Sequence, residues 1–228
     1  MNIFDIIGPV MIGPSSSHTA GAVRLGRVAN KVMDGKKPVS VDIILSGSFA
    51  RTYRGHGTDR ALLAGIMGYH SYSEEIRDAL EIARREGIAY RFIEQDIRNA
   101  HPNTARIHFK TEDGSEGTVE GASIGGGNIR IDQVNGMSVD FTGENNTILV
   151  LHWDKPGVIA DVTNLMRLKY PGANISNFHL SRKERGGEAL MTLELDRGRG
   201  SVEASEHEMA ADIRSLNNVI NAIVIRAI

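Results

Sequence analysis

Residues 147–195 read TILVLHWDKPGVIADVTNLMRLKYPGANISNFHLSRKERGGEALMTLEL, and their pattern determines the expected architecture of the C-terminal part of the chain. Runs rich in β-branched residues alternate with a segment whose apolar residues recur at helical spacing, and R185-G-G187 marks a hairpin turn. With the residues that follow, the predicted elements are a strand at 147–153, a helix at 157–168, strands at 173–182 and 188–195, a helix at 202–216 and a strand at 219–226. This βαββαβ order is the ferredoxin-like arrangement. Its sheet would keep an open edge, so we expect these domains to self-associate side by side.

The preceding part of the chain is predicted to be a mixed α/β domain with a hairpin-rich sheet. Apolar residues at helical spacing indicate helices, whereas β-branched runs between turn residues indicate strands. The expected helices begin at residue 22 and span 60–68 and 73–86, and the expected strands span 39–46, 89–94, 105–110, 117–124, 129–134 and 137–141. The polar segment T142-G-E-N-N146 is the expected linker. The sequence therefore predicts an α+β protein with domains at residues 1–143 and 147–228.

The composition of the 228-residue chain excludes several classes of function. A net charge of −2, without a basic cluster interleaved with aromatic residues, argues against nucleic-acid binding. Residues Met1–Gly8 lack the features of a signal peptide and no apolar run approaches a membrane span, so we expect a cytoplasmic protein without membrane contact. The chain has no cysteine, so it cannot form a disulfide or a thiolate-bound metal centre alone. Any metal chemistry would require a partner chain to hold the metal.

The segment I12-G-P-S-S-S-H-T-A-G21 carries three consecutive serines, a histidine and a threonine just before a predicted helix. The free N–H groups and the dipole of a helix start favour a carboxylate or phosphate there, and the imidazole of His18 adds an adjustable donor. These residues could serve only as caps, but capping needs one hydroxyl, and Ala20 and Gly21 leave the backbone open to close approach. The segment therefore predicts an anion site made by Ser15, Ser16, Ser17 and Thr19.

Two further polar segments are candidates for the same site. His56 is predicted to lie in an open loop between two glycines, with its imidazole accessible, and Thr58 and Asp59 follow as helix caps. The segment G125-G-G-N128 follows a predicted strand, and its consecutive N–H groups could form an anion-binding nest. A flexible or bulged hairpin loop explains the same glycines equally well. If the nest forms, its contributors are Gly125, Gly126 and Asn128.

Three of these segments, GPSSSHTAG at 13–21, GHGTD at 55–59 and ASIGGGNI at 122–129, resemble motifs of the beta subunit of the bacterial iron–sulfur L-serine dehydratases. The resemblance covers essentially the whole chain. D154-K-P-G157, between a strand and a helix, is similar to the signature of ACT regulatory modules. The resemblance implies an N-terminal domain of the allosteric-substrate-binding type followed by an ACT domain. It also implies a partner alpha subunit whose cysteines hold a 4Fe–4S cluster, in agreement with the cysteine-free chain here.

The reaction that the resemblance implies is the conversion of L-serine to pyruvate and ammonia. A base must remove the weakly acidic Cα proton while an electrophile assists the departing hydroxide. An iron ion of the partner subunit would be the electrophile, and the resemblance puts forward His18 and His56 as the base. The residues leave open which histidine removes the proton and which orients the substrate. The serine carboxylate would be held by Ser15, Ser16, Ser17 and Thr19.

The ACT resemblance also implies an effector site. In the serine-binding ACT module of phosphoglycerate dehydrogenase, a histidine and an asparagine of the first loop and an asparagine opening the second strand bind serine at a domain interface. The matching positions are His152, Asp154 and Asn174, and Gly157 belongs to the signature. Asp154 departs from that pattern, and its carboxylate could hold the ammonium group of an effector.

Two other functions remain as alternatives. Domains resembling residues 1–141 also occur as allosteric anion-binding modules, so both domains could be sensors with no share in the active site. Two accessible histidines favour the enzyme subunit, because anion binding alone does not need them. A pyridoxal-phosphate dehydratase would need a Schiff-base lysine in a phosphate-binding fold, whereas the lysines here occur in turns or on polar faces. No metal-ligand set is predicted on this chain.

Overall fold

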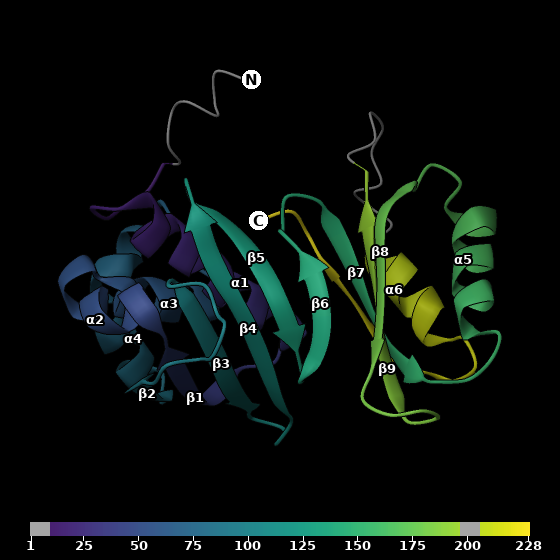
Figure 1. Ribbon diagram of the computed structural model, residues 1–228, viewed down its shortest axis with the longest axis horizontal. Helices are drawn as coiled ribbons and strands as arrows, with labels where there is room; N and C mark the ends of the chain where they lie inside the picture. Colours follow the sequence, from purple (N-terminus) through teal and green to yellow (C-terminus); the bar gives the residue numbers. More distant parts are fainter. Residues whose placement is uncertain (1–9, 197–205) are drawn as a thin grey trace. The chain divides into compact units, whose positions relative to one another are not determined.

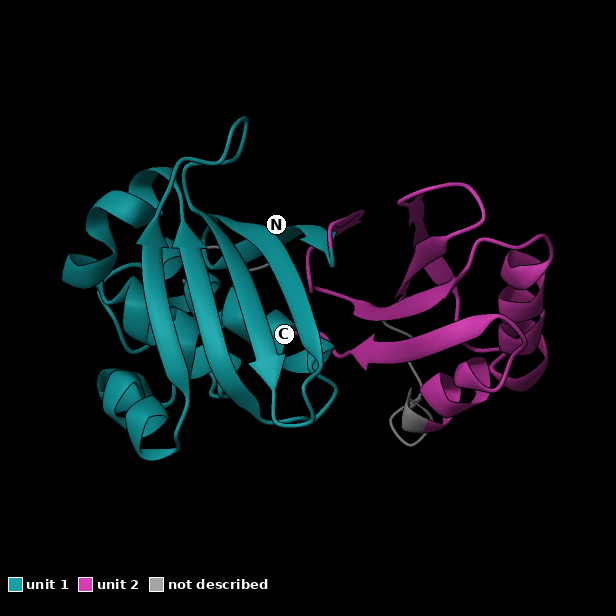
Figure 2. Cartoon of the chain, turned by 90° about the horizontal axis from the view of Figure 1, so that it is seen from below, with its two compact units in different colours: residues 1–135 teal, residues 136–228 magenta. Residues whose placement is uncertain are grey.

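The computed structural model describes residues 10–196 and 206–228. The chain divides into two compact units, residues 1–135 and 136–228 (Figure 2). The division falls in the turn Asn135-Gly136, whose φ angles of 52° and 75° are those of a tight hairpin turn. The domain boundary expected at the 142–146 linker stays a prediction. No helix in the described part of the chain is long and apolar enough to cross a membrane.

The first sheet has the strand order β2-β1-β3-β4-β5-β6 (Figure 1). β1 pairs with β2 in parallel, whereas the pairs β1–β3, β3–β4 and β4–β5 are antiparallel. The strands are β1 (Pro38–Leu45), β2 (Ala89–Glu94), β3 (Thr104–Thr111), β4 (Glu116–Gly125), β5 (Asn128–Val134) and β6 (Met137–Phe141). Each of the six predicted strands is confirmed, with shifts of only a residue or two at the ends.

Helical segments of the first unit pack against this sheet and against one another. They are η2 (Ser16–Gly21, a π-helical turn), α1 (Ala22–Val32), α2 (Gly47–His56), α3 (Thr58–Ile66), η3 (Glu74–Asp78, a 3₁₀ turn) and α4 (Ala79–Arg85). The helix expected at 73–86 is therefore divided between η3 and α4. The loop expected around His56 is wrong, because residues 47–56 are helical. Phe49 and Tyr53, one turn apart, give α2 a buried face.

Two glycines let α1 and α3 cross in backbone contact. A Cβ atom added at Gly26 would lie 2.3 Å from the carbonyl oxygen of Leu62, and one added at Gly65 would lie 2.1 Å from the carbonyl oxygen of Val23. No larger residue fits either position without separating the helices. α1 continues directly from η2, and only Gly57 separates α2 from α3. This crossing therefore positions the segments that carry His18 and His56.

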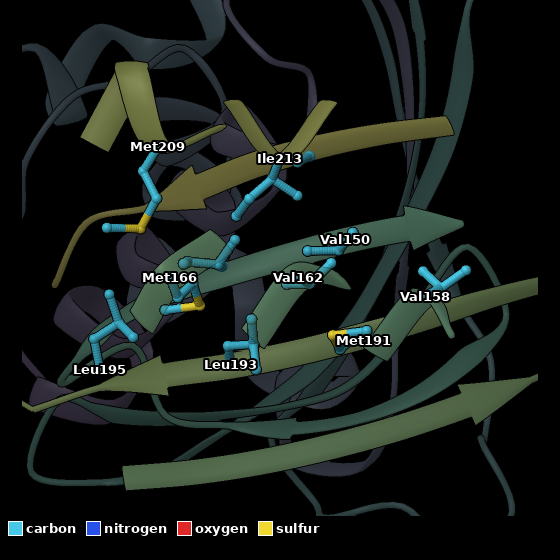
Figure 3. Packing of buried hydrophobic residues seen from close by; sticks show 11 residues of the cluster. Val150, Val158, Val162, Met166, Met191, Leu193, Leu195, Met209 and Ile213 are labelled. Carbon is cyan, nitrogen blue, oxygen red and sulfur yellow. The ribbon is translucent and has the colours of Figure 1, made fainter. Parts of the chain in front are cut away.

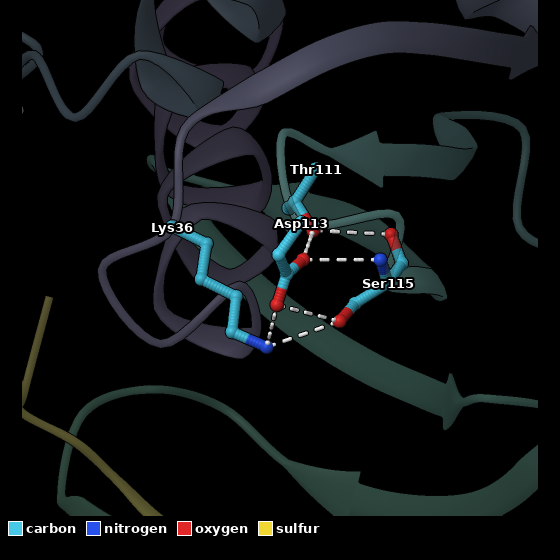
Figure 4. A network of polar contacts seen from close by, with 4 residues as sticks. All are labelled: Lys36, Thr111, Asp113 and Ser115. Carbon is cyan, nitrogen blue, oxygen red and sulfur yellow. Dashed lines mark hydrogen bonds and ion pairs between the residues drawn. The ribbon is translucent and has the colours of Figure 1, made fainter.

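The turn between β3 and β4 is held by a compact polar network (Figure 4). Asp113 accepts hydrogen bonds from the Thr111 hydroxyl at 2.7 Å and from the N–H and hydroxyl of Ser115, each at 3.0 Å. Lys36 Nζ lies 2.7 Å from Asp113 Oδ2, the oxygen that also accepts from the Ser115 hydroxyl. Lys36, followed by the Thr111 and Ser115 donors, holds the pKa of Asp113 well below its usual range. The network ties the chain entering β1 to the predicted E112-D-G-S115 turn.

The second unit confirms the predicted βαββαβ order. Its sheet has the order β10-β7-β9-β8, with every adjacent pair antiparallel. The elements are β7 (Asn146–Trp153), α5 (Val158–Lys169), β8 (Ile175–Arg182), β9 (Glu188–Leu195), α6 (Glu206–Arg214) and β10 (Val219–Ile225). The first residues of the helix expected at 202–216 lie outside the described residues.

The core of this unit lies between the sheet and its two helices (Figure 3). Val150, Met191 and Leu193 point from the sheet toward Val162 of α5 and Ile213 of α6, and all five side chains are fully buried. Alternate residues of each strand face this core, as the period of two requires.

The edge strand β8 carries side chains on both faces. On the face away from the helices, the Ser181 hydroxyl donates to the carbonyl of Ser138 in β6 at 2.6 Å. Phe178 and Leu180 alternate along β8 with polar residues such as Ser181, and their side chains are 41% and 39% exposed. The sheet edge in this unit therefore presents apolar surface.

Candidate functional site

His18 lies in η2, the helical turn that leads into α1. Ser15 caps this turn, since its hydroxyl accepts a hydrogen bond from the His18 N–H at 3.4 Å, and the helix continues without a break into α1. The hydroxyls predicted to stand at a helix start therefore do so. His18 itself is only 9% exposed. The prediction that it lies in an open, accessible loop is wrong, because Phe49 of α2 packs on its ring at a centroid distance of 5.3 Å.

Two serines orient the His18 imidazole. Nδ1 lies 3.2 Å from the Ser17 hydroxyl and 3.4 Å from the Ser15 hydroxyl, and these two hydroxyls are 3.3 Å apart. Nε2 is buried and has no hydrogen-bond partner among the described residues. A ring held through Nδ1 with a vacant Nε2 can accept a proton at Nε2. The serine cluster therefore acts on the histidine as well as on the helix end.

His56 is the last residue of α2, and Gly57, with a φ of 71°, ends that helix in the left-handed conformation. Its side chain is exposed, as predicted. The His56 and His18 rings meet edge to face, with their centroids 4.7 Å apart. The structure thus brings together the two histidines that the sequence places 38 positions apart.

The histidine pair is electrostatically asymmetric. Burial, and secondarily the positive charge that His56 can carry, lower the pKa of His18 below its usual value of 6.5. His18 is therefore neutral at pH 7 and retains a lone pair for a proton. Repulsion between two charged imidazoles in contact therefore adds to burial in keeping His18 neutral.

A cavity of about 360 Å³ opens beside this pair. Thr19, His56 and the segment Ile12–Pro14 line it, together with residues of α3 and η3. The Thr19 side chain is buried, and its hydroxyl has no partner among the described residues. Three arginines also line the cavity, and the sequence analysis did not single them out: Arg54, Arg60 and Arg77. The first two flank the GHGTD motif, a signal visible in the sequence, whereas Arg77 reaches the cavity only through the fold.

The small residues after His18 have a different role from the predicted one. Ala20 and Gly21 are buried, and a Cβ atom added at Gly21 would lie 2.1 Å from the hydroxyl oxygen of Ser123 in β4. Here the close approach is between the helix and its own sheet rather than between the backbone and a ligand. Thr58 and Asp59 are likewise buried in the first turn of α3, where Asp59 Oδ1 accepts from the Arg60 N–H at 2.8 Å, as its expected capping role requires, whereas the Thr58 hydroxyl has no partner among the described residues.

The segment Gly125–Asn128 forms the hairpin turn between β4 and β5. Its three glycines have φ angles of 107°, 61° and 84°, all in the region that favours glycine. Arg24 of α1 donates to the carbonyl of Gly127 at 2.8 Å and to Asn128 Oδ1 at 3.4 Å. These contacts and the bulge before Gly125 agree with the hairpin interpretation. Anion binding by Gly125, Gly126 and Asn128 stays a prediction.

The predicted effector residues of the second unit do not converge within one chain. His152 is buried, with Nδ1 2.8 Å from the Trp153 carbonyl. Asp154 accepts from Arg182 at 2.7 Å and from the Gly186 N–H at 2.9 Å, and these donors, Gly186 first, lower the pKa of Asp154. Gly157, with a φ of 95°, begins α5.

Asn174 is instead at the opposite end of the sheet. It precedes β8 and donates to Asp196 at 2.5 Å. On β9, His152 is opposite Ala189, whereas Ile175 is opposite Leu195. Six residues of strand separate these positions, which corresponds to about 20 Å. One site containing both His152 and Asn174 would therefore need a second copy of the chain.

Among the described residues, no three His, Asp or Glu side chains are grouped so that they could hold a metal ion. The asymmetric histidine pair, its serine partners and the cationic cavity are therefore the chemical features of the first unit.

Comparisons with known proteins identify the family of the chain. The sequence model of the serine dehydratase beta chain family matches residues 2–134. The chain is 46% identical over 195 residues to the "Probable L-serine dehydratase, beta chain" of Bacillus subtilis, covering 86% of this chain and 87% of that protein. It is 38% identical to the "L-serine dehydratase, beta chain" of Peptoniphilus asaccharolyticus, covering 85% and 86%. It is also 30% identical to the D-3-phosphoglycerate dehydrogenase of B. subtilis, covering 77% of this chain and 33% of that protein. The chain belongs to the family of serine dehydratase beta chains.

Proposed function

We propose that this chain is the beta subunit of an L-serine dehydratase and that it supplies the proton-abstracting histidine of an active site completed by an alpha subunit. The observation that carries the proposal is the contact between His18 and His56 beside the 360 Å³ cavity. Its pairing with an alpha subunit agrees with the beta-chain names of the relatives from Bacillus subtilis and Peptoniphilus asaccharolyticus. The enzyme would be cytoplasmic and would degrade L-serine to pyruvate and ammonia.

His18 is the better suited of the two histidines to act as the base. It is neutral at pH 7 because burial lowers its pKa, and Ser17 holds Nδ1 so that Nε2 is vacant. His56 is exposed and lines the cavity, where its imidazole can donate a hydrogen bond to a carboxylate. In this assignment His18 removes the Cα proton of serine and His56 orients the substrate. His18 must become reachable at the alpha-subunit interface, because the chain alone leaves it 9% exposed.

The hydroxyls of Ser15, Ser16 and Ser17 are partly exposed around the helix start and would hold the serine carboxylate. Thr19 would contribute its buried hydroxyl from the cavity wall. A 4Fe–4S cluster held by cysteines of the alpha subunit would supply the Lewis acid for the leaving hydroxide. This chain has no cysteine and would hold no part of the cluster.

The second unit would be an ACT domain that senses an amino acid between two copies of the chain. Its βαββαβ order and the exposed Phe178 and Leu180 on the edge strand support self-association there. Across such an interface, His152 and Asp154 of one copy would share an effector with Asn174 of the other. Calorimetry of the full chain with a panel of amino acids tests this role, and no heat with any of them would count against it.

A purely regulatory function is the second candidate. The match to a phosphoglycerate dehydrogenase over 77% of this chain favours it, because that enzyme has a different chemistry from a serine dehydratase. Replacing His18 and His56 separately by alanine in the assembled enzyme distinguishes the two. The proposed function predicts a large loss of kcat in at least one variant, whereas near-normal kcat in both would leave the chain a regulatory role.

A further inference from the structure

We propose that the cavity beside His56 is a binding site for a small dianion, such as a sulfate-like or phosphate-like group or a dicarboxylate, and that an anion bound there competes with serine. The site itself is inferred from the cavity. Its effect on turnover rests on the proposed function, because the effect requires His56 to be part of the active site.

The charge of the cavity wall is the first argument. Arg54, Arg60 and Arg77 line the cavity from α2, α3 and η3, and no acidic side chain lines it within residues 10–196 and 206–228. Among the described residues, none of these arginines forms an ion pair. The nearby carboxylate of Asp59 is buried in α3, where burial raises its pKa while Arg60 and Arg54 act in the opposite direction. Among the described residues, this carboxylate therefore interacts with two of the arginines at a distance, and none of the three guanidinium groups is held in an ion pair.

The geometry of the donors is the second argument. Guanidinium groups present planar pairs of N–H donors that match sulfate, phosphate and carboxylate oxygens. Arg54 is pre-positioned, because its Nε donates to the Tyr53 hydroxyl at 3.0 Å while its guanidinium lies over the Tyr53 ring. The buried, unpartnered hydroxyl of Thr19 adds a neutral donor to the wall. The cavity wall thus combines a donor that is held in place, the Arg54 guanidinium, with a hydroxyl donor that can rotate, that of Thr19.

The same wall disfavours an amino acid as the preferred ligand. In this chain without its alpha subunit, an α-ammonium group placed among three arginines would be repelled, and no carboxylate among the described residues of the wall is there to hold it. A dianion gains from every arginine and has no group that suffers repulsion. Because His56 lines the cavity, a bound dianion would occupy the space in front of this imidazole.

Calorimetry of the full chain tests the site without using its activity. Sulfate, malonate, acetate and L-serine are titrated separately at one ionic strength, since exposed charges are screened by salt. We expect sulfate or malonate, or both, to bind more tightly than acetate and L-serine. We expect Arg60→Gln and Arg77→Gln each to weaken dianion binding about tenfold. Arg51→Gln is the matched control, because Arg51 is exposed on the same helix as Arg54 but does not line the cavity.

The results separate the site from the proposed function. Equal binding of L-serine and the dianions, or equal losses in the Arg51 and Arg60 variants, would overturn the site. In the assembled enzyme, the dianion that binds should raise KM for L-serine without changing kcat, and Arg77→Gln should reduce this inhibition. Dianion binding without inhibition of an active complex would overturn the competition. If the complex has no serine dehydratase activity, the proposed function fails while calorimetry still decides on the site.

Discussion

Replacing Gly65 by alanine should destabilise the first unit and disturb the histidine pair. Gly65 lies within α3, where alanine is ordinarily the better helix former by about 1 kcal/mol. Here, however, the added Cβ would lie 2.1 Å from the carbonyl oxygen of Val23 and 3.0 Å from the N–H nitrogen of Arg27. Both are backbone atoms of α1, so the contact is relieved only if the two helices move apart.

The magnitude follows from these opposing terms. Overpacking a close-packed core costs about 1–3 kcal/mol, and the gain in helix propensity offsets up to about 1 kcal/mol. With the full offset, we therefore expect Gly65→Ala to lower the free energy of unfolding by up to about 2 kcal/mol. Gly55→Ala is the matched control, since Gly55 lies in α2 with nothing within 4 Å of an added Cβ. It should raise the free energy of unfolding by about 0.5–1 kcal/mol.

Urea unfolding followed by far-UV circular dichroism measures both variants, because the single tryptophan, Trp153, lies outside the first unit. With a typical dependence of about 1–3 kcal/mol per molar urea, the two midpoints should differ by about 1 M. The assembled Gly65→Ala enzyme should also lose activity, since the α1–α3 crossing positions η2 beside α2. A Gly65→Ala variant as stable as the Gly55→Ala variant would refute the inferred helix contact.

Three further predictions follow from individual contacts. Ser15→Ala removes the cap of η2 and should cost about 1 kcal/mol of stability, measured by thermal unfolding; an unchanged Tm would show that the cap does not stabilise the turn. Because the pKa of His18 is lowered, its neutral form persists as the pH falls, so the acid limb of kcat/KM in the assembled enzyme should have its midpoint below 6.5; a midpoint above 6.5 would contradict the role of His18 as base. Leu193→Ala opens a cavity in the core of the second unit and should cost about 2–5 kcal/mol, followed by Trp153 fluorescence; a loss below 1 kcal/mol would contradict the packing in Figure 3.

The periodic parts of the sequence were sufficient to predict most of the fold. The β-branched runs gave all ten strands, and R185-G-G187 and N135-G136 marked hairpins that the structure contains. Helix α2 was missed because two glycines and two arginines interrupt any apolar pattern in residues 47–56. In the sequence, only Phe49 and Tyr53, one turn apart, indicate the buried face of α2. That face is covered only when α3 and the sheet are in place.

Of the candidate site, only the part that depends on local sequence could be predicted. The serines and His18 mark a helix start that local sequence specifies. The contact of His18 with His56 and the burial of His18 depend on the α1–α3 crossing through Gly26 and Gly65, which no local pattern reveals. Arg77 reaches the cavity through tertiary packing alone. The residue types were sufficient to select candidate site residues, whereas the distances between these residues could be known only from the folded structure.

The central proposal is that this chain completes an active site with an alpha subunit. The most direct measurement is anaerobic pyruvate formation from L-serine by this chain alone, by the alpha subunit alone and by the two mixed, with His18→Ala and His56→Ala in parallel. The account predicts activity only in the mixture, and loss of that activity when His18 is replaced. Full activity of the alpha subunit alone, merely modulated by this chain, would contradict it.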